Sequence, residues 1–433
     1  MSIPQKIIHP GRNDLYNELH ARPLPVIESC ARISHIALLV DEQQQLDDFH
    51  HLQQLCRHYQ VTPPDHAVSS FSAVLGDLEL RWERHLEFIA YTFLRHGVNE
   101  SPFTHSAWSL LPQAWVEGLC GQLVVALHLE LTTDGTEHWS KEQLVECFQG
   151  QRTLRATLAQ GAGTLVSAFR LHDDGFGRIV LQTEGLRASQ QGRLVQRVLE
   201  LETYRLKAML SARMARDLAP VLSGMDRDLA TLITQLTRAE HLSKERALLD
   251  ELTQMAARVE QYRAQTNSRF AATRAYYGMV QQRLKELDEI TSGNQFTLAD
   301  FLSRRLTPAV NTCEAVGVRL EDVAKRIERA GDLIRTRVDL NLESQNRDLL
   351  DSMDRRSKLQ LRLQETVEGL SIAAISYYAV NLLRLLFNAV PEYVPGFDAN
   401  IATAVSIPLV VGAVWWVTRR IKKMIIGADR LSK

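Results

Sequence analysis

The sequence has few cysteines, almost no net charge and no apolar run near its start. Its five cysteines are scattered without a C-x-x-C pair, which excludes a zinc ribbon and a disulfide scaffold and is typical of a reducing compartment. Fifty basic residues balance fifty-one acidic residues, so no charge excess favours nucleic acid as a partner. Because the segment from Met1 to Pro23 is polar, we expect no cleaved signal peptide.

Motifs of known catalytic chemistry are lacking as well. The sequence contains no H-E-x-x-H, G-x-S-x-G, Walker A or G-x-G-x-x-G pattern. It therefore gives no support for an enzyme, and we expect no resident cofactor, with a divalent cation such as magnesium left open. What is present is the composition of a folded protein, 45% hydrophobic and 23% charged, in a chain of 433 residues that is long enough for several domains.

Two long apolar runs lie near the end of the chain. Residues 369–387 hold one charge, Arg384, and residues 399–417 hold none. As helices, runs of this length span about 28 Å, close to the thickness of the hydrocarbon core of a bilayer. The short connector at 388–398 then predicts an antiparallel transmembrane hairpin. The alternative is a pair of helices buried in a soluble core.

Basic residues flank both runs on the side away from the connector. The positive-inside rule therefore places both termini in the cytoplasm and the connector outside, in a protein with two spans. The residues that carry this prediction are Arg355, Arg356, Lys358 and Arg362 before the first run, Arg419, Arg420, Lys422 and Lys423 after the second, and the acidic Glu392 and Asp398 in the connector.

The middle of the chain, residues 186–368, has steady three-four apolar spacing. Two heptad series, within residues 248–280 and 316–334, predict a long helical coiled-coil stalk. We expect a turn between Gly293 and Pro308, and then one continuous helix that leads into the first apolar run. Such a rod would either transmit a signal or act as a passive spacer.

Residues 1–185 have the mixed pattern of an α/β domain. Segments 33–40 and 123–131 predict strands, residues 163–171 and 176–182 a hairpin, and residues 43–58 and 141–159 helices. The overall prediction is an α+β protein with four parts: an α/β domain at 1–185, a stalk at 186–368, a transmembrane hairpin at 369–418 and a basic tail at 419–433.

Two polar clusters in this first domain are candidates for a site. One contains His20 and Arg22, and in the other the alternation of a strand would put Glu83, His85 and Glu87 on one face. A histidine with two carboxylates could bind a divalent metal or perform acid–base work. We favour the alternative, a solvated strand face or ion pairs that dock the N-terminal arm. The pairs Asp47-Asp48 and His50-His51, on a predicted helix, are expected at the surface.

Three strings in the sequence resemble a bacterial family of uncharacterised membrane-anchored proteins. They are NDLYNELHARP at 13–23, RWERHLEF at 81–88 and ETVEGLSIAAISYYAVNLL at 365–383. The resemblance covers essentially the whole chain and implies an architecture, with the bacterial inner membrane as the location, but no activity.

The layout also resembles that of CorA-type magnesium channels, which join a cytoplasmic α/β domain through a long helix to two C-terminal spans. Their Y-G-M-N and M-P-E hallmarks correspond here to YAVN at 378–381 and VPE at 390–392, with Ala379 and Val380 in place of the glycine and methionine. The resemblance implies that the first span lines a pore.

Small and polar residues share one face of that span. In a symmetric oligomer they could line an ion path, and Glu392 could concentrate cations outside. The alternative is that they mediate helix packing in the membrane. The candidates on this face are Glu368, Ser371, Tyr378 and Asn381.

The functional prediction is a membrane-anchored sensor or scaffold that forms homo-oligomers, with an unidentified protein partner. A divergent CorA-like divalent cation channel is the first alternative. The second is a metal-dependent enzyme that uses the polar clusters of the N-terminal domain.

Overall fold

The structure is a computed structural model, and its described residues fall in seven stretches besides His9 and Arg12. These stretches are 26–65, 68–97, 101–133, 140–238, 242–291, 296–389 and 399–429.

The chain divides into two compact units, which we describe separately. The first, residues 1–238 with 247–331, is called the sheet domain, and the second, residues 239–246 with 332–433, is called the tail unit. The combination of a mixed sheet with long helices confirms the predicted α+β class.

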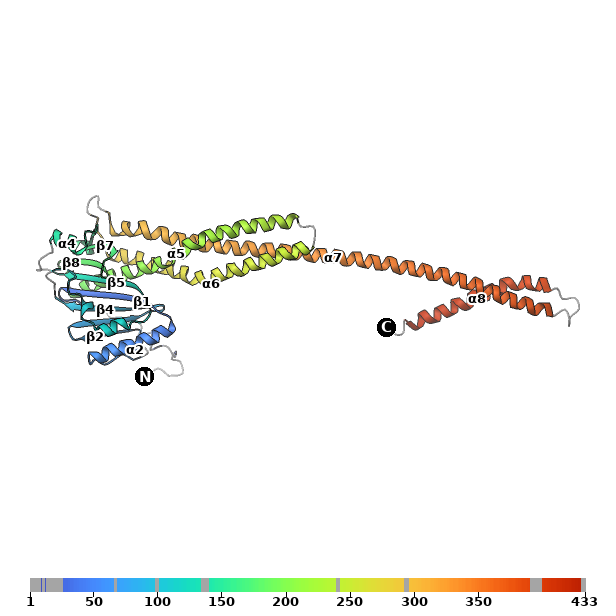
Figure 1. Cartoon of the computed structure of the whole chain (residues 1–433), viewed down its shortest axis with the longest axis horizontal. Coiled ribbons are helices and arrows are strands. Elements are labelled where there is room, and N and C mark those ends of the chain that lie inside the picture. The colour runs from blue at the N-terminus through green and yellow to red at the C-terminus, as the bar shows by residue number, and fades with distance from the viewer. Residues whose placement is uncertain are drawn as a thin grey trace, which may run out of the picture. The chain divides into compact units, whose positions relative to one another are not determined.

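The sheet domain is built on one eight-stranded sheet with the order β2-β3-β4-β1-β5-β8-β7-β6 (Figure 1). Neighbouring strands are antiparallel except β5 and β8, which run parallel. The predicted hairpin is confirmed as β7 and β8, joined at Asp173-Asp174-Gly175. The strands are β1 (Ala31–Leu39), β2 (Ser70–Leu75), β3 (Leu78–Arg84), β4 (Phe88–His96), β5 (Gln122–Thr132), β6 (Leu154–Leu158), β7 (Gly163–Leu171) and β8 (Gly177–Thr183).

Both faces of the sheet are covered by helices. One face packs against α2 (Glu42–His58), η2 (Ala107–Leu110), α3 (Gln113–Glu117) and α4 (Lys141–Cys147). The other packs against the ends of three long helices that meet the strands in a single apolar cluster. Strand β1 lies in the middle and is buried on both sides, so its polar residues Arg32, Ser34 and His35 are buried with its apolar ones.

Two local predictions were wrong. The helix expected over 141–159 ends at Cys147, because Gln149 and Gly150 adopt positive φ angles that stop a helix, and β6 follows. The strand expected through residues 82–88 ends at Arg84. Residues 85–87 form the turn to β4, which the hydrogen bond from the His85 N–H to the Phe88 carbonyl closes at 2.8 Å.

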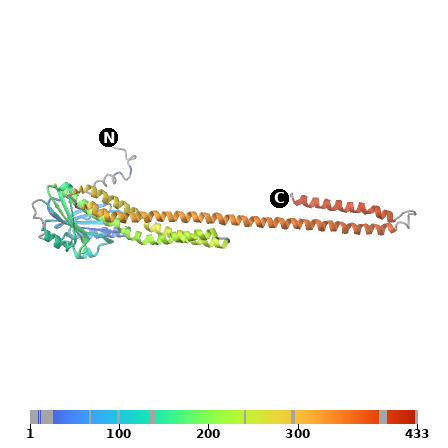
Figure 2. The ribbon, with the colours of Figure 1, turned by 90° about the horizontal axis from the view of Figure 1, so that it is seen from above.

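Three helices, rather than two, make up the middle of the chain. They are α5 (Ala188–Arg238), α6 (Leu242–Glu286) and α7 (Leu298–Ala389). Within the sheet domain they lie side by side (Figures 1 and 2). Residues of both predicted heptad series are buried, including Leu252, Val259, Leu320 and Val323. The series therefore mark true contact faces, and α5 supplies a further one.

The turn was expected between Gly293 and Pro308, and the start of helix α7 falls inside this range. Helix α7 begins at Leu298, whose N–H donates to a Glu289 carboxylate oxygen at 2.7 Å. Thr297 caps the same end by accepting from the Asp300 N–H at 2.9 Å. Pro308 lies inside the helix, and Leu306, two residues before it, is buried, which indicates that packing outweighs the missing hydrogen bond.

The tail unit contains the second part of α7 and α8 (Ala399–Asp429), which folds back beside the end of α7 (Figures 1 and 2). Both helices hold a window long and apolar enough to cross a membrane, and only 6% of each window is buried within the chain. A core helix of a soluble protein would be mostly buried. The two apolar runs are therefore confirmed as exposed helices with the dimensions of membrane spans.

Candidate functional site

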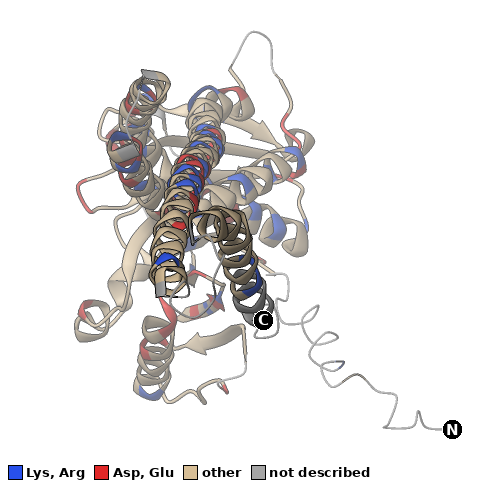
Figure 3. Ribbon diagram, turned by 90° about the vertical axis from the view of Figure 1, so that its right-hand side faces the viewer, with Lys and Arg blue, Asp and Glu red and all other residues tan. Residues whose placement is uncertain are grey.

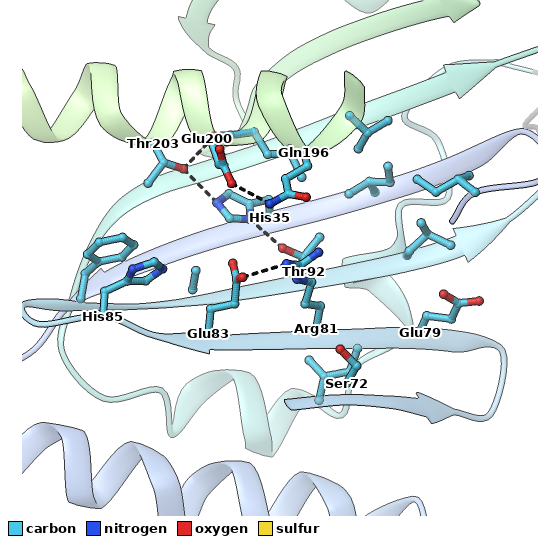
Figure 4. Close-up of a pocket in the computed structure, with 18 of the residues that line it drawn as sticks. His35, Ser72, Glu79, Arg81, Glu83, His85, Thr92, Gln196, Glu200 and Thr203 are labelled. Carbon is cyan, nitrogen blue, oxygen red and sulfur yellow. Dashed lines mark hydrogen bonds and ion pairs between the residues drawn. The ribbon is translucent and has the colours of Figure 1, made fainter. Parts of the chain in front are cut away.

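A cavity of about 250 Å³ opens on the face of the sheet that carries α5 (Figure 4). Strands β1 to β4 form its floor, and residues 195–204 of α5 form its wall. Apolar side chains such as Ile33, Leu94 and Val195 make up part of the lining. The polar residues that line it are His35, Ser72, Glu79, Arg81, Glu83, His85, Thr92, Gln196, Glu200 and Thr203.

The alternation of β3 explains why charges gather in this cavity. Residues 79, 81 and 83 of β3 point to the cavity, whereas Leu80 and Trp82 pack in the core on the opposite face. Arg81 is in register with Ser72 on β2 and with Thr92 on β4, and Thr92 is in register with His35 on β1. A polar row therefore crosses four strands of the sheet.

His35 ends this row as a buried neutral imidazole. The Thr203 hydroxyl donates to the Leu199 carbonyl at 2.8 Å, so it accepts from His35 Nε2 at 3.0 Å. His35 Nδ1 then accepts from the Thr92 hydroxyl at 2.8 Å. Burial, assisted by the charge of Arg81, lowers the pKa of His35 to about 4. His35 thus fixes α5 to the sheet and does not act as a proton donor near neutral pH.

The charged side chains of the cavity are arranged in ion pairs. Arg81 binds Glu83 at 3.0 Å, and His96 binds Glu79 at 2.9 Å. Glu200 is bound by Arg283 from α6, and it also accepts from the Gln196 amide nitrogen at 2.7 Å. The amide oxygen of Gln196 is buried and has no hydrogen-bond partner in the described part of the chain.

A second polar cluster lies around Glu87, in the turn between β3 and β4. Its carboxylate accepts from the Tyr276 hydroxyl at 2.6 Å and from Arg269 at 2.7 Å, and the Lys207 ammonium is 3.1 Å away. Burial alone would raise the pKa of Glu87, but these three partners outweigh it, and the pKa is lowered. The cluster ties the turn to both α5 and α6.

Lys207 is the least accessible charge of this cluster. Its side chain is 1% exposed, and its nitrogen is 3.7 Å from the centre of the Phe88 ring and 4.8 Å from that of Tyr276. Burial lowers the pKa of Lys207 to about 8, although Glu87 opposes the change. His85 stacks on Phe88 at 4.0 Å, so Phe88 separates His85 from Lys207.

The structure separates the predicted residues of the N-terminal site. Glu83 and His85 line the cavity, whereas Glu87 belongs to the neighbouring cluster. His20 and Arg22 lie outside the described residues. Among the residues that the structure describes, no group of three or more histidine, cysteine, aspartate or glutamate side chains could hold a metal ion.

Sequence reasoning missed most of the groups that shape the two clusters. His35 offered a signal, because it is a polar residue inside the apolar strand ARISHIALL. Arg81 and Thr92 lie on the neighbouring strands β3 and β4, and the others come from α5 and α6, which are distant in the sequence, so they carry no local signal. The missed residues are His35, Arg81, Thr92, Gln196, Glu200, Thr203, Lys207, Arg269 and Tyr276.

The predicted pore residues lie on α7 in the tail unit. Ser371, Tyr378 and Asn381 are exposed, and Glu368 is half-buried. Glu392 lies outside the described residues. Their role in an ion path stays a prediction.

Comparison with known proteins gives a family but no activity. No curated protein matches the chain. Among solved structures, the full-length CmaX protein matches 76% of this chain and 94% of its own length at 15% identity, with a TM-score of 0.15. At so low a score the two folds do not superpose, so nothing about this chain is inferred from the likeness. Residues 8–425 match the model of the family described as "Protein of unknown function (DUF3422)", and because the match spans nearly the whole chain, the chain belongs to that family.

Proposed function

We propose that the chain is an inner-membrane scaffold whose copies associate through the exposed part of α7. The apolar ends of α7 and α8 would form the transmembrane hairpin, with both termini and the sheet domain in the cytoplasm. The support for the anchor is the pair of exposed apolar helices, and the support for this orientation is the basic residues that flank them.

The observation that carries association is the exposure of residues 342–367 of α7. All 26 side chains of this stretch are exposed, which leaves about 39 Å of helix without a packing partner. An isolated helix of this length is only marginally stable in water. The stretch nevertheless carries eight large apolar side chains, namely Leu342, Leu349, Leu350, Met353, Leu359, Leu361, Leu363 and Val367.

The charges of this stretch favour a second copy of the chain as the partner. Residues 342–367 hold five acidic and five basic side chains, and the two signs are interspersed along the helix (Figure 3). Identical helices of this kind meet without net repulsion and can form ion pairs along their edges. A strongly basic or acidic partner would gain little from such a surface.

Association can be tested by measuring the mass of the full chain in detergent. We expect an oligomer, and we expect Leu349→Glu or Met353→Glu to lower its mass, because each places a charge in the apolar contact. Ser344→Glu adds the same charge to another side of the helix and should leave the mass unchanged. A monomeric wild-type chain, or equal masses for all four proteins, would refute the proposal.

A CorA-like ion path is the second candidate, and one observation favours it. Ser371, Tyr378 and Asn381, three of the predicted pore residues on α7, are exposed and so can face another subunit or lipid. The burial of Ser376 on α7 and Ser406 on α8, 4% and 8% exposed, fits the alternative of helix packing at small residues in the tail unit. Magnesium flux into proteoliposomes that falls with Asn381→Ala but not with Tyr377→Phe would support conduction, and absence of flux would remove it.

A further inference from the structure

We propose that the N-terminal arm of the chain, residues 13–25, docks on the cavity between β1–β4 and α5 and places the side chain of Leu24 in it (Figure 4). This inference goes beyond the proposed function, because a contact within the sheet domain requires neither the bilayer nor the association of α7.

The carboxylates of the lining are already paired within the chain, so they do not select a charged ligand. These pairs are Glu79–His96, Glu83–Arg81 and Glu200–Arg283. Burial keeps the pKa of His35 near 4, so this imidazole adds no charge at neutral pH. An occupant therefore gains most from the apolar part of the lining, which includes Ile33, Leu94, Val195 and Leu199.

The arm joins the sheet domain at the edge of this cavity. Val26, the first residue of the described stretch 26–65, lines the cavity and is 58% exposed. The next residue, Ile27, is buried, and its N–H donates to the Ala188 carbonyl at the start of α5 at 3.2 Å. The point at which the arm meets the sheet domain is therefore fixed beside the cavity.

Covalent geometry keeps Leu24 near that point. Two residues of chain span at most about 7 Å, so the Cα atom of Leu24 lies within this distance of that of Val26. Proline disfavours the helical conformation of the residue before it, and Leu24 precedes Pro25 as Arg22 precedes Pro23. The sequence thus favours an extended end of the arm, with Leu24 as the leucine closest to the cavity.

The volume of the cavity fits such a side chain. An apolar cavity of about 150 Å³ is large enough to bind benzene, which is bigger than the side chain of leucine. The volume here is about 250 Å³, which leaves room for part of a proline ring as well. Docking would also cover the exposed Val26, and the free energy gained grows with the apolar area that is removed from water.

The accessibility of a thiol in the cavity tests the proposal. Thr92→Cys places a reporter in the lining on β4, and the rate of its alkylation by iodoacetamide is measured by mass spectrometry in the full chain in detergent. We expect Leu24→Ser to raise this rate at least fivefold, because the arm then leaves the cavity. The native Cys120, half-buried and outside the lining, is the internal control and should react at an unchanged rate.

Two further variants keep the test decisive. Leu15→Ser makes the same change at another leucine of the arm, and we expect it to leave the rate at position 92 unchanged. Ser72→Cys is a second reporter in the lining, on β2, which does not touch His35 and should respond to Leu24→Ser as the first reporter does. Equal rates with Leu24 and with Leu24→Ser at both reporters would overturn the proposal.

A mixing experiment identifies the chain that supplies the arm. The reporter chain that carries Leu24→Ser is mixed with a tenfold excess of the wild-type chain before alkylation. We expect its rate to stay high, because each arm docks on its own sheet domain. A return to the slow rate would show that a second copy supplies the arm, and it would overturn the proposal that the contact lies within one chain.

Discussion

Replacing Glu87 with glutamine should destabilise the sheet domain by about 3–5 kcal/mol, the usual effect of removing one partner of a buried ion pair. Lys207, in a site that is 1% exposed beside Phe88 and Tyr276, would lose the carboxylate that opposes the effect of burial. Its pKa would therefore fall further below about 8, and the folded chain would bear the cost of either a buried charge or a lost proton. Tyr276 and Arg269 would also lose a charged acceptor at 2.6 and 2.7 Å.

Removing the other partner of the pair, Lys207, should destabilise the sheet domain far less. In Lys207→Met the buried charge is gone, and Glu87 keeps both Arg269 and Tyr276 as partners. Methionine also fills a similar volume beside the two aromatic rings. We expect a change of less than about 1.5 kcal/mol, as for other buried ions replaced by apolar side chains of similar size.

Amide hydrogen exchange of β3 and β4 in the full chain measures both effects, since it reports the local free energy of opening. The double variant Glu87→Gln/Lys207→Met is the control, because it removes the unpaired lysine and should restore most of the lost protection. A single Lys207→Met variant that is less protected than Glu87→Gln, or a double variant that is no better protected than Glu87→Gln, would contradict this role of the buried charge.

This cluster also shows where sequence reasoning stops. Glu87 was singled out with Glu83 and His85, on the assumption that all three belong to one strand. The turn at residues 85–87 breaks that alternation and sends Glu87 to α5 and α6. Its partners follow it by more than a hundred positions in the chain, so only tertiary packing brings them together.

The fold was more predictable where local signals and packing agree. The β7–β8 hairpin has the turn sequence Asp173-Asp174-Gly175 between two apolar strands, and periodicity alone identified the buried faces of α6 and α7. At residues 154–158 the apolar pattern was too short to separate a strand from the end of a helix. Pairing with β7 decides it in favour of β6.

Helix α2 gives the clearest example of a local pattern that was misjudged. Asp47-Asp48 and His50-His51 were both expected at the surface, but only Asp47 and His50 are exposed. Asp48 and His51 are buried, in line with Leu52 and Leu55 at the spacing of one helix face. Two polar residues in succession lie about 100° apart on a helix, so one of them can face the core.

The burial of Asp48 leads to the second strong prediction. Its side chain is fully buried and accepts from the Trp82 indole at 3.1 Å and from the Tyr91 hydroxyl at 2.9 Å. We expect Asp48→Ala to destabilise the sheet domain by about 2–4 kcal/mol, because two buried donors lose their acceptor. Asp47→Ala, the control next to it, should change the stability by less than about 0.5 kcal/mol.

The dependence on pH separates this explanation from a simple loss of packing. Burial raises the pKa of Asp48 to about 6, so in the wild-type chain this group adds stability as the pH falls through 6 towards its unfolded value near 3.8. The alanine variant lacks that gain. Its deficit relative to wild type should therefore be about 1 kcal/mol larger at pH 5 than at pH 7, measured by exchange in β3 and β4. A deficit that is constant, or smaller at pH 5, would mean that Asp48 acts through shape alone.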